Sequence, residues 1–241
     1  MSLLFAMGKR PDAEAIAACA AAAGKAVPFA ISHQPADHPY WVELLVLGLT
    51  FDVQGLSPGI PARADAAVHG FAVLPKDLEG LEALTVRPGP HLAAAGPLPP
   101  VVRALAALGC ELARLPGLQA IGWSASRAAM APEYYQRSVG AWLDGGVFPG
   151  LGLTALVRSP DGAVQTEGLA LHIGHELRLE PLAGEPPADT ARQALRLIHH
   201  LVANGPYPPG PGRGPGGDIL NCDYVDRRSV LRIRRDVGAT P

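Results

Sequence analysis

The stretch GLGLTALVRSPDGAVQTEGLALHIGHELRLEPL, residues 150–182, contains two apolar runs separated by Pro160, Asp161 and Gly162. Proline, aspartate and glycine are typical turn residues, and alternation of apolar and polar side chains is typical of strands. The stretch therefore predicts an antiparallel hairpin whose second strand continues into the residues that follow.

The same stretch contains His172-Ile173-Gly174-His175, which matches the HIGH signature of class I aminoacyl-tRNA synthetases. In those enzymes the signature follows the first strand of a nucleotide-binding fold, and a lysine-rich KMSKS loop comes later. Here the string lies two-thirds along the chain, within the expected strand, and no KMSKS-like segment follows it. We therefore interpret the string as accidental and expect Gly174 to form a bulge or bend.

Strand-like and helix-like segments make up most of the remaining chain. Apolar, β-branched runs predict strands at residues 3–7, 27–32, 41–56, 67–74 and 118–123. Proline-led or helically periodic segments predict helices at residues 11–23, 99–115, 132–143 and 189–204. Helices between antiparallel-looking strands predict an α+β fold, with mixed or antiparallel sheets packed against helices. A strand followed by a proline-acid pair and a helix recurs near Pro11 and Pro132, which suggests two similar halves.

These patterns predict one α+β globular domain over residues 1–205, with halves at 1–96 and 97–205. Prolines remove hydrogen-bond donors and glycines add chain entropy, so residues 206–217 are expected to form a loop. Residues 218–241 have strand composition and predict either a strand pair that closes the sheet or an arm that orders against a partner. We favour the structural strand pair.

Composition limits the classes of protein to which the chain can belong. Of the 241 residues, 48% are hydrophobic and 17% charged, as in folded globular proteins, and the net charge of −2 gives no field that would attract nucleic acid or anionic lipid. Cys19, Cys110 and Cys222 lie far apart without a CxxC pair. Neither a signal-peptide pattern nor an apolar run of about 20 residues is present. We expect a cytoplasmic protein with no cofactor, metal, nucleic-acid partner or membrane contact.

A family resemblance rests on residues of the opening stretch. Thr166, Gly168 and Leu169, followed by Gly174 and residues 176–180, resemble the T-x-G-L, then F-G-x-x-E-[apolar]-E stretch of a bacterial family, domain of unknown function 4261. The resemblance implies an α+β fold and supplies no reaction, because these are packing and turn positions.

Other segments agree with the family in order and extend the resemblance over roughly residues 1–205. They are the first strand with its proline-acid helix, a short strand opened by His91, the long helix from Pro99, and IGWSAS before Pro132. The chain departs from the family after Gly205, where a Pro/Gly-rich segment replaces the family's G, apolar, D-G-D-T turn.

Two groups of residues are candidates for a functional site. The first is a pocket near a strand end, formed by His91, Trp123, Ser124 and Tyr134. No G-x-S-x-G elbow surrounds Ser124, so no catalytic residue is assigned. The second is a basic surface that could hold an acidic partner, formed by Arg227, Arg228, Arg232, Arg234 and Arg235.

Histidines near the N-terminus are a weaker candidate for metal binding. His33 and His38 flank a Pro-Ala-Asp turn in SHQPADHPYW, residues 32–41, and could gather ligands in a loop. No sequence pattern identifies an acidic residue or cysteine elsewhere in the chain as a third ligand, so we assign no metal.

Missing catalytic motifs and near-neutral charge favour a non-enzymatic protein-binding module, either an adaptor or an immunity-type protein, and the family resemblance implies a bacterial one. Its partner would be a protein, and a homodimer is compatible with the same sequence. The alternative is an enzyme of unknown reaction with a pocket near His91, Trp123 and Tyr134.

Overall fold

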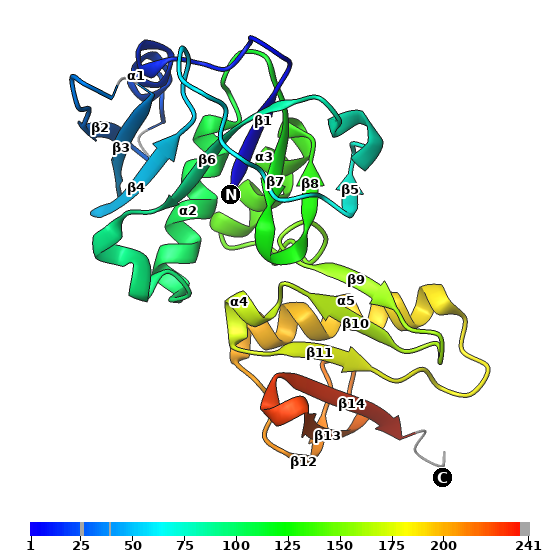
Figure 1. Cartoon of the computed structure of the whole chain (residues 1–241). Coiled ribbons are helices and arrows are strands. Elements are labelled where there is room, and N and C mark those ends of the chain that lie inside the picture. Colours follow the sequence, from blue (N-terminus) through cyan, green and yellow to red (C-terminus); the bar gives the residue numbers. More distant parts are fainter. Residues whose placement is uncertain (25–26, 39, 237–241) are drawn as a thin grey trace. The chain divides into compact units, whose positions relative to one another are not determined.

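The structure is a computed structural model that describes residues 1–24, 27–38 and 40–236. It divides the chain into two compact units, Met1–Gly146 and Val147–Pro241. Each unit contains helices and one sheet, and both sheets mix parallel and antiparallel pairing (Figure 1). The predicted α+β fold class is therefore confirmed.

The N-terminal unit is built on eight strands. They are β1 (Ser2–Phe5), β2 (Phe29–His33), β3 (Trp41–Val46), β4 (Leu49–Gln54), β5 (His69–Phe71), β6 (Glu82–Pro88), β7 (Leu118–Trp123) and β8 (Ala128–Met130). Their order in the sheet is β2-β3-β4-β6-β1-β7-β8-β5. Neighbours pair antiparallel except β5 and β8, which are parallel.

Among its described residues this unit has three α-helices, α1 (Ala13–Ala21), α2 (Pro99–Leu112) and α3 (Pro132–Leu143). Local sequence explains where they begin. The Asp12 carboxylate caps α1 by accepting a hydrogen bond from the Ala15 N–H at 2.9 Å. Pro99 and Pro132 occupy the first turns of α2 and α3, where a missing N–H breaks no helical hydrogen bond. All three helices were predicted from the sequence.

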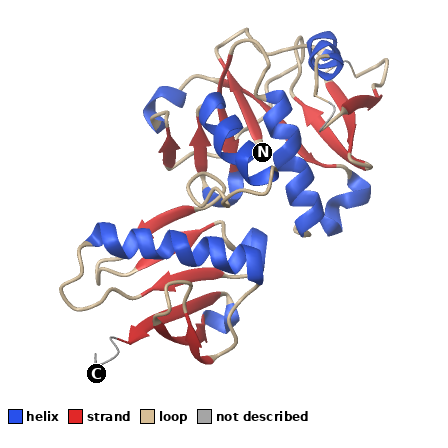
Figure 2. Ribbon diagram, turned by 180° about the vertical axis from the view of Figure 1, so that it is seen from behind, coloured by secondary structure: helices blue, strands red, loops and turns tan. Residues whose placement is uncertain are grey.

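The central strand β1 has a core on each side because its side chains alternate. Leu3 and Phe5 are fully buried on one side of the strand. Helices α2 and α3 cover a face of the sheet (Figure 2). Leu4 points the other way and packs with Ala83 and Ala120. The connection between β4 and β6 covers that second cluster with Ala64, Val73, Leu78 and Leu81.

Three details of this unit correct the sequence prediction. Strand β6 was not predicted, because Gly80 and the Pro88–Pro90 segment frame it with turn signals. His91 does not open a strand but lies in a 3-10 turn, η2 (Pro90–Ala95), whose Leu92 N–H donates to the Gly89 carbonyl. Since β1 lies between β6 and β7, residues before and after position 96 share one sheet, and the expected halves 1–96 and 97–205 are not separate bodies.

As far as Asp236, the C-terminal unit has six strands and one long helix. The strands are β9 (Ala155–Arg158), β10 (Val164–Glu167), β11 (Glu176–Leu179), β12 (Gly210–Arg213), β13 (Ile219–Val225) and β14 (Val230–Asp236), in the order β12-β13-β14-β11-β10-β9. The helices are α4 (Ala170–Ile173) and α5 (Pro187–Asn204), and α5 covers one face of the sheet (Figure 2). The hairpin predicted around Pro160–Gly162 is confirmed, with Arg158 opposite Val164 and Gly162 at φ 86°.

Residues 219–236, which form β13 and β14, belong to this sheet. Strand β14 pairs in parallel with β11, and β13 pairs antiparallel with β14. The expected organisation, one domain over residues 1–205 followed by a loop and an arm, is therefore replaced by a unit that runs from Val147. The Pro/Gly segment expected as a loop contains β12. Pro211 is tolerated there because β12 is an edge strand, where a missing donor breaks no ladder.

A buried ion pair holds β14 to the segment before α5. Arg235 donates two hydrogen bonds to the Glu185 carboxylate, and the two side chains are 8% and 12% exposed. Thr190 Oγ1 and the Leu182 N–H also donate to Glu185. The Arg235 hydrogen bonds, with help from Thr190 and Leu182, lower the pKa of Glu185 to about 2 despite its burial.

Leu108→Ala should destabilise the protein by about 2–5 kcal/mol, because Leu108 is fully buried on α2 and its truncation leaves a cavity. Urea unfolding of both proteins measures the difference. Leu74→Ala, at a side chain that is 55% exposed, is the control and should shift the midpoint little. Equal midpoints for Leu108→Ala and wild type would contradict this core assignment.

Glu185→Gln should lower the melting temperature at pH 7, since removing one partner of a buried pair costs about 3–5 kcal/mol. A carboxyl whose pKa is lowered by folding stabilises above its unfolded pKa and loses that contribution as pH falls through its folded pKa. The difference in melting temperature between wild type and variant should therefore disappear as the pH falls from about 4.5 to about 2. Asp189→Asn, in an exposed pair with Arg192, should show no comparable gap. A gap that persists at pH 2 would exclude ionisation as its cause.

Candidate functional site

The four residues of the predicted pocket lie at two places along the sheet of the N-terminal unit. Trp123 ends β7 and is 2% exposed, and Ser124 follows it on the surface. Tyr134 lies on α3 and stacks on Phe71, with ring centroids 6.0 Å apart. His91 is exposed in η2, which contacts β4 and β6, and β1 separates β6 from β7. Strand β1 therefore separates the part of the sheet near His91 from the strand that ends at Trp123.

The predicted basic surface is largely engaged in ion pairs within the C-terminal unit. Arg235 is buried against Glu185 and does not belong to an exposed surface. Arg232 donates two hydrogen bonds to Asp223, and Arg234 reaches the same carboxylate at 3.9 Å, so these two arginines share a face as expected. The remaining two, Arg227 and Arg228, are exposed in the turn between β13 and β14.

The HIGH string does not lie in a strand, which corrects that part of the prediction. Ala170–Ile173 forms one helical turn, α4, and Gly174 ends it at φ 86°. Burial lowers the pKa of His172 to about 4, and its ring lies 4.8 Å from that of Phe148. His175 is 5% exposed, and its ring lies 5.2 Å from Tyr224. Both imidazoles pack inside their own unit.

Glu176 explains why the backbone turns at this point. Its carboxylate accepts hydrogen bonds from the backbone N–H groups of Gly168, Leu169 and Ala170 and from the Thr166 hydroxyl. These bonds satisfy amides at the start of α4 that have no partner within the helix. The residues of the family resemblance thus form one hydrogen-bonded structural unit.

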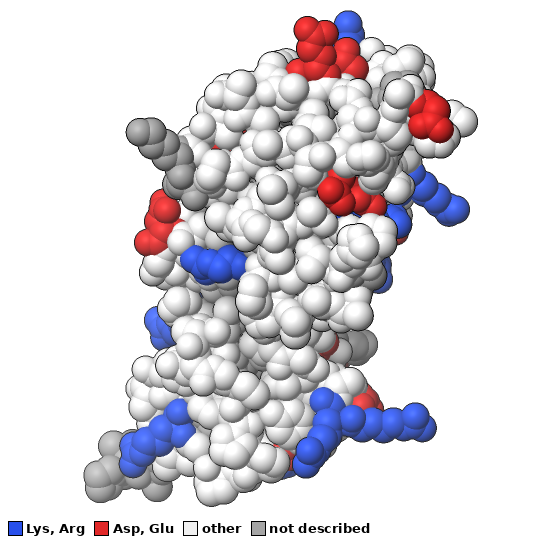
Figure 3. All heavy atoms as spheres, turned by 90° about the vertical axis from the view of Figure 1, so that its left-hand side faces the viewer, with Lys and Arg blue, Asp and Glu red and all other residues white. Residues whose placement is uncertain are grey.

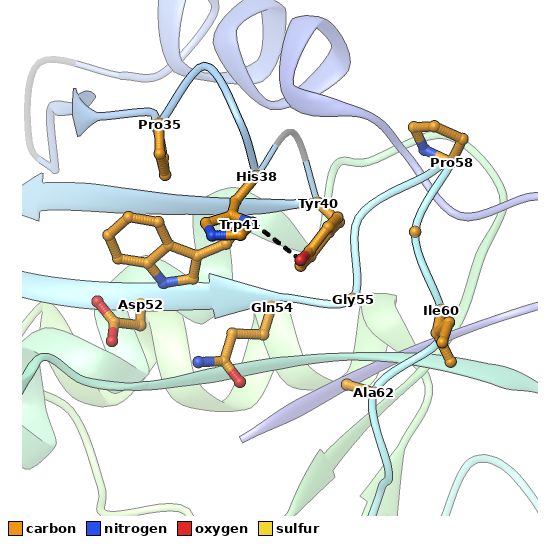
Figure 4. Close-up of a pocket in the computed structure, with 11 residues that line it drawn as sticks. Pro35, His38, Tyr40, Trp41, Asp52, Gln54, Gly55, Pro58, Ile60 and Ala62 are labelled. Atoms are coloured by element: carbon orange, nitrogen blue, oxygen red, sulfur yellow. Dashed lines mark hydrogen bonds between the residues drawn. The ribbon is translucent and has the colours of Figure 1, made fainter.

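A different site is formed by the strands β3 and β4 and the loop that follows them. Eleven residues line a cavity of about 760 Å³ that we call the aromatic groove: Pro35, His38, Tyr40, Trp41, Asp52, Gln54, Gly55, Pro58, Gly59, Ile60 and Ala62. Trp41, Asp52 and Gln54 lie along the strands, with Pro58 and Ile60 across from them on the loop (Figure 4). A cavity of this size with few polar groups is typical of ligand or peptide sites.

Strand alternation places these side chains in the groove. Val42 and Val53 are fully buried in the core, so Trp41, Asp52 and Gln54, at alternate positions, point to the opposite face of the sheet. The β4–β6 connection covers the middle of that face through its cluster around Leu4. The β3–β4 part of the face remains accessible at the groove.

Arg10 fixes the loop wall of the groove. Its guanidinium donates to the carbonyls of Gly55 and Gly59 and to the Glu82 carboxylate, and its side chain is 8% exposed. The loop backbone adds hydrogen bonds from Gly55 and Leu56 to the Tyr40 carbonyl. The loop is therefore held against both β6 and the segment before β3.

Glycine is required at two positions of this wall. Gly55 has a φ of 91°, and a Cβ there would lie 2.6 Å from the backbone nitrogen of Ala62. A Cβ on Gly59 would lie 2.2 Å from the Cβ of Tyr40. The missing side chain of Gly59 therefore allows the loop to approach Tyr40, and that of Gly55 allows the loop to fold back on Ala62 and to approach β6.

Asp52 is the one acidic residue among those that line the groove. Its Oδ1 is buried and has no hydrogen-bond partner among the described residues. Burial is the main cause that raises the pKa of Asp52, the Glu43 carboxylate raises it further, and a hydrogen bond from Trp41 acts in the opposite direction. On the rim, His38 Nδ1 and Tyr40 Oη lie 2.9 Å apart in a hydrogen bond (Figure 4).

The predicted histidine loop contributes to this groove, but with different chemistry. His33 packs on the edge of Trp41, with ring centroids 5.4 Å apart, and His38 bonds to Tyr40. Within the part of the chain that the structure describes, no cluster of three histidine, cysteine or acidic side chains could hold a metal. Asp52 and Gln54 were not singled out, although the alternating polar positions of residues 41–54 indicated which side chains leave the core.

No family model, curated protein or solved structure matches the chain. Among the described residues, no helix is long and apolar enough to span a membrane.

Gly59→Ala should destabilise the protein by about 1–3 kcal/mol and open the groove, because the added Cβ overlaps Tyr40. Chemical denaturation measures the stability, and the fluorescence of Trp41 reports the groove. Gly140→Ala on α3, where a Cβ meets nothing within 4 Å, is the matched control and should not destabilise. A Gly59→Ala protein as stable as wild type would show that the two walls are not in close contact.

Proposed function

We propose that the chain is a non-enzymatic protein-binding module of bacteria, an adaptor or immunity-type protein of the cytoplasm, and that it binds its partner in the aromatic groove. The observation that carries the proposal is the exposure of apolar side chains on the rim. Ile60 is 87% exposed and Tyr40 42% exposed, beside the half-buried Trp41. Exposed apolar surface around a cavity marks interaction sites, and tyrosine and tryptophan are enriched in interfaces.

The groove's polar groups favour binding over catalysis. Among its described lining residues, His38, Asp52 and Gln54 carry the polar side chains besides the rings of Tyr40 and Trp41, and no serine, threonine, cysteine or lysine lines it. His38 is bonded to Tyr40 on the rim. The site thus offers shape, aromatic surface and a carboxylate, which are features suited to binding a partner's side chain.

We also propose that the chain is a distant member of the domain of unknown function 4261 family. What supports this proposal is that Thr166, Gly168, Leu169 and Glu176, on which the resemblance rests, are joined by hydrogen bonds. A shared structural unit of this kind concerns fold and does not define a reaction.

A photo-cross-linking residue, p-benzoylphenylalanine, in place of Ile60 should capture a protein partner in the native host. Because the groove is the proposed interface, Tyr40→Ala in the same chain should reduce that capture. The matched control is the same cross-linker at Met7, which is 76% exposed and outside the groove. Mass spectrometry identifies the captured protein, which could also be a second copy of the chain. Capture of no protein at Ile60, or of the same proteins at both positions, would refute the proposed surface.

A further inference from the structure

The aromatic groove contains a carboxylate that the fold itself does not neutralise. Asp52 pairs across β3–β4 with Glu43 and across β4–β6 with Arg87. Glu43 accepts a hydrogen bond from Ser32 Oγ at 2.7 Å and adds a second negative charge near Asp52. Among the described residues, neither Arg87 nor another cation forms an ion pair with Asp52, and Oδ1 stays without a hydrogen bond. The Asp52 side chain therefore lines the cavity as a carboxylate whose charge no cation of the described residues balances.

The charge on Asp52 works against the stability of the free protein. Burial and Glu43 raise its pKa, which means that folding favours the protonated form over the carboxylate. A neutral side chain at position 52 would therefore make the unliganded protein more stable. Groups whose titration is perturbed in this way, when they line a cleft, mark functional sites.

Aromatic surface next to this carboxylate is suited to a cation. Trp41 and Tyr40 both line the groove, and Figure 4 shows the Trp41 indole beside Asp52. An ammonium or guanidinium group within about 6 Å of a ring centroid gains cation–π attraction, and aromatic cages bind such groups in water. A carboxylate adds a charge-assisted hydrogen bond of higher strength than a neutral one.

We propose that the aromatic groove binds a lysine or arginine side chain of the protein partner, with Asp52 as acceptor and with Trp41 and Tyr40 packing against the aliphatic stem and cationic group. The proposal rests on the proposed function for the claim that the ligand belongs to a protein. The cavity volume of about 760 Å³ also admits residues that flank the cation, and these would contact Pro58 and Ile60.

Recognition of this kind depends on local chemistry. The chain has a net charge of −2, and on the side shown in Figure 3 acidic and basic side chains are scattered among uncharged surface. A partner is therefore selected by the group that enters the groove, because a neutral side chain leaves Asp52 unpaired and an acidic one is repelled by Asp52 and Glu43.

The test is an NMR titration of the full ¹⁵N-labelled chain, followed at the indole N–H of Trp41. The probes are the N-acetyl methylamides of lysine, arginine and the neutral norleucine, whose side chain resembles that of lysine without the ammonium. We expect lysine or arginine to bind about tenfold more tightly than norleucine, as expected for one charge-assisted hydrogen bond. Asp52→Asn should abolish this preference, whereas Asp77→Asn, the same charge change at an exposed position outside the groove, should preserve it.

Thermal melting shows that the variants are folded, and Asp52→Asn should melt at or above the wild-type temperature because it removes a disfavoured charge. Equal affinity for norleucine and lysine, or a preference that survives Asp52→Asn, overturns the cation site. A partner captured at Ile60 would in that case still support the proposed function. Cationic probes that bind while no protein is captured at Ile60 would instead overturn the proposed function, and with it the assignment of the cation to a protein.

Discussion

The guanidinium group of Arg10 joins three segments of the N-terminal unit, and the candidate site depends on it. It reaches the carbonyls of Gly55 and Gly59 on the loop after β4 and the carboxylate of Glu82 at the start of β6. The planar fork of arginine can serve several acceptors at once, which a lysine ammonium does less well. Held in this way, the loop stands as a wall opposite Trp41 and Asp52 and leaves a cavity between them.

Charged side chains have the same structural role in the C-terminal unit. Arg235 and Glu185 connect the last strand to the segment before α5, and Glu176 satisfies the amides of the α4 turn. The charges that stabilise the fold are therefore paired and partly withdrawn from water. Asp52 differs from them, since it lines a cavity and has a buried oxygen without a partner among the described residues. The paired charges thus stabilise the fold, whereas the charge of Asp52 is available to a ligand.

The candidate site could be predicted only in part. The segment SHQPADHPYW, residues 32–41, was noticed for its histidines, and it does supply Pro35, His38 and Tyr40 to the groove. Its histidines, however, contact aromatic side chains: His33 packs on Trp41, and His38 is hydrogen-bonded to Tyr40. The other wall comes from residues 55–62, a turn-rich stretch whose position follows from the Arg10 contacts across 45 to 49 residues of sequence. No local pattern reports a contact of that range.

By itself the sequence determined the starts of α1, α2 and α3 and the turn of the β9–β10 hairpin, because capping and turn residues act over a few residues. Asp12, Pro99, Pro132 and the Pro160–Gly162 turn lie where their chemistry predicts. Tertiary structure decided the rest. Pairing of β14 with β11 put residues 230–236 into a sheet that begins near residue 155, and β6 became an inner strand although turn signals frame it. Ladder hydrogen bonds and buried surface between distant segments outweigh local propensity, so their partners are settled only when the whole unit packs.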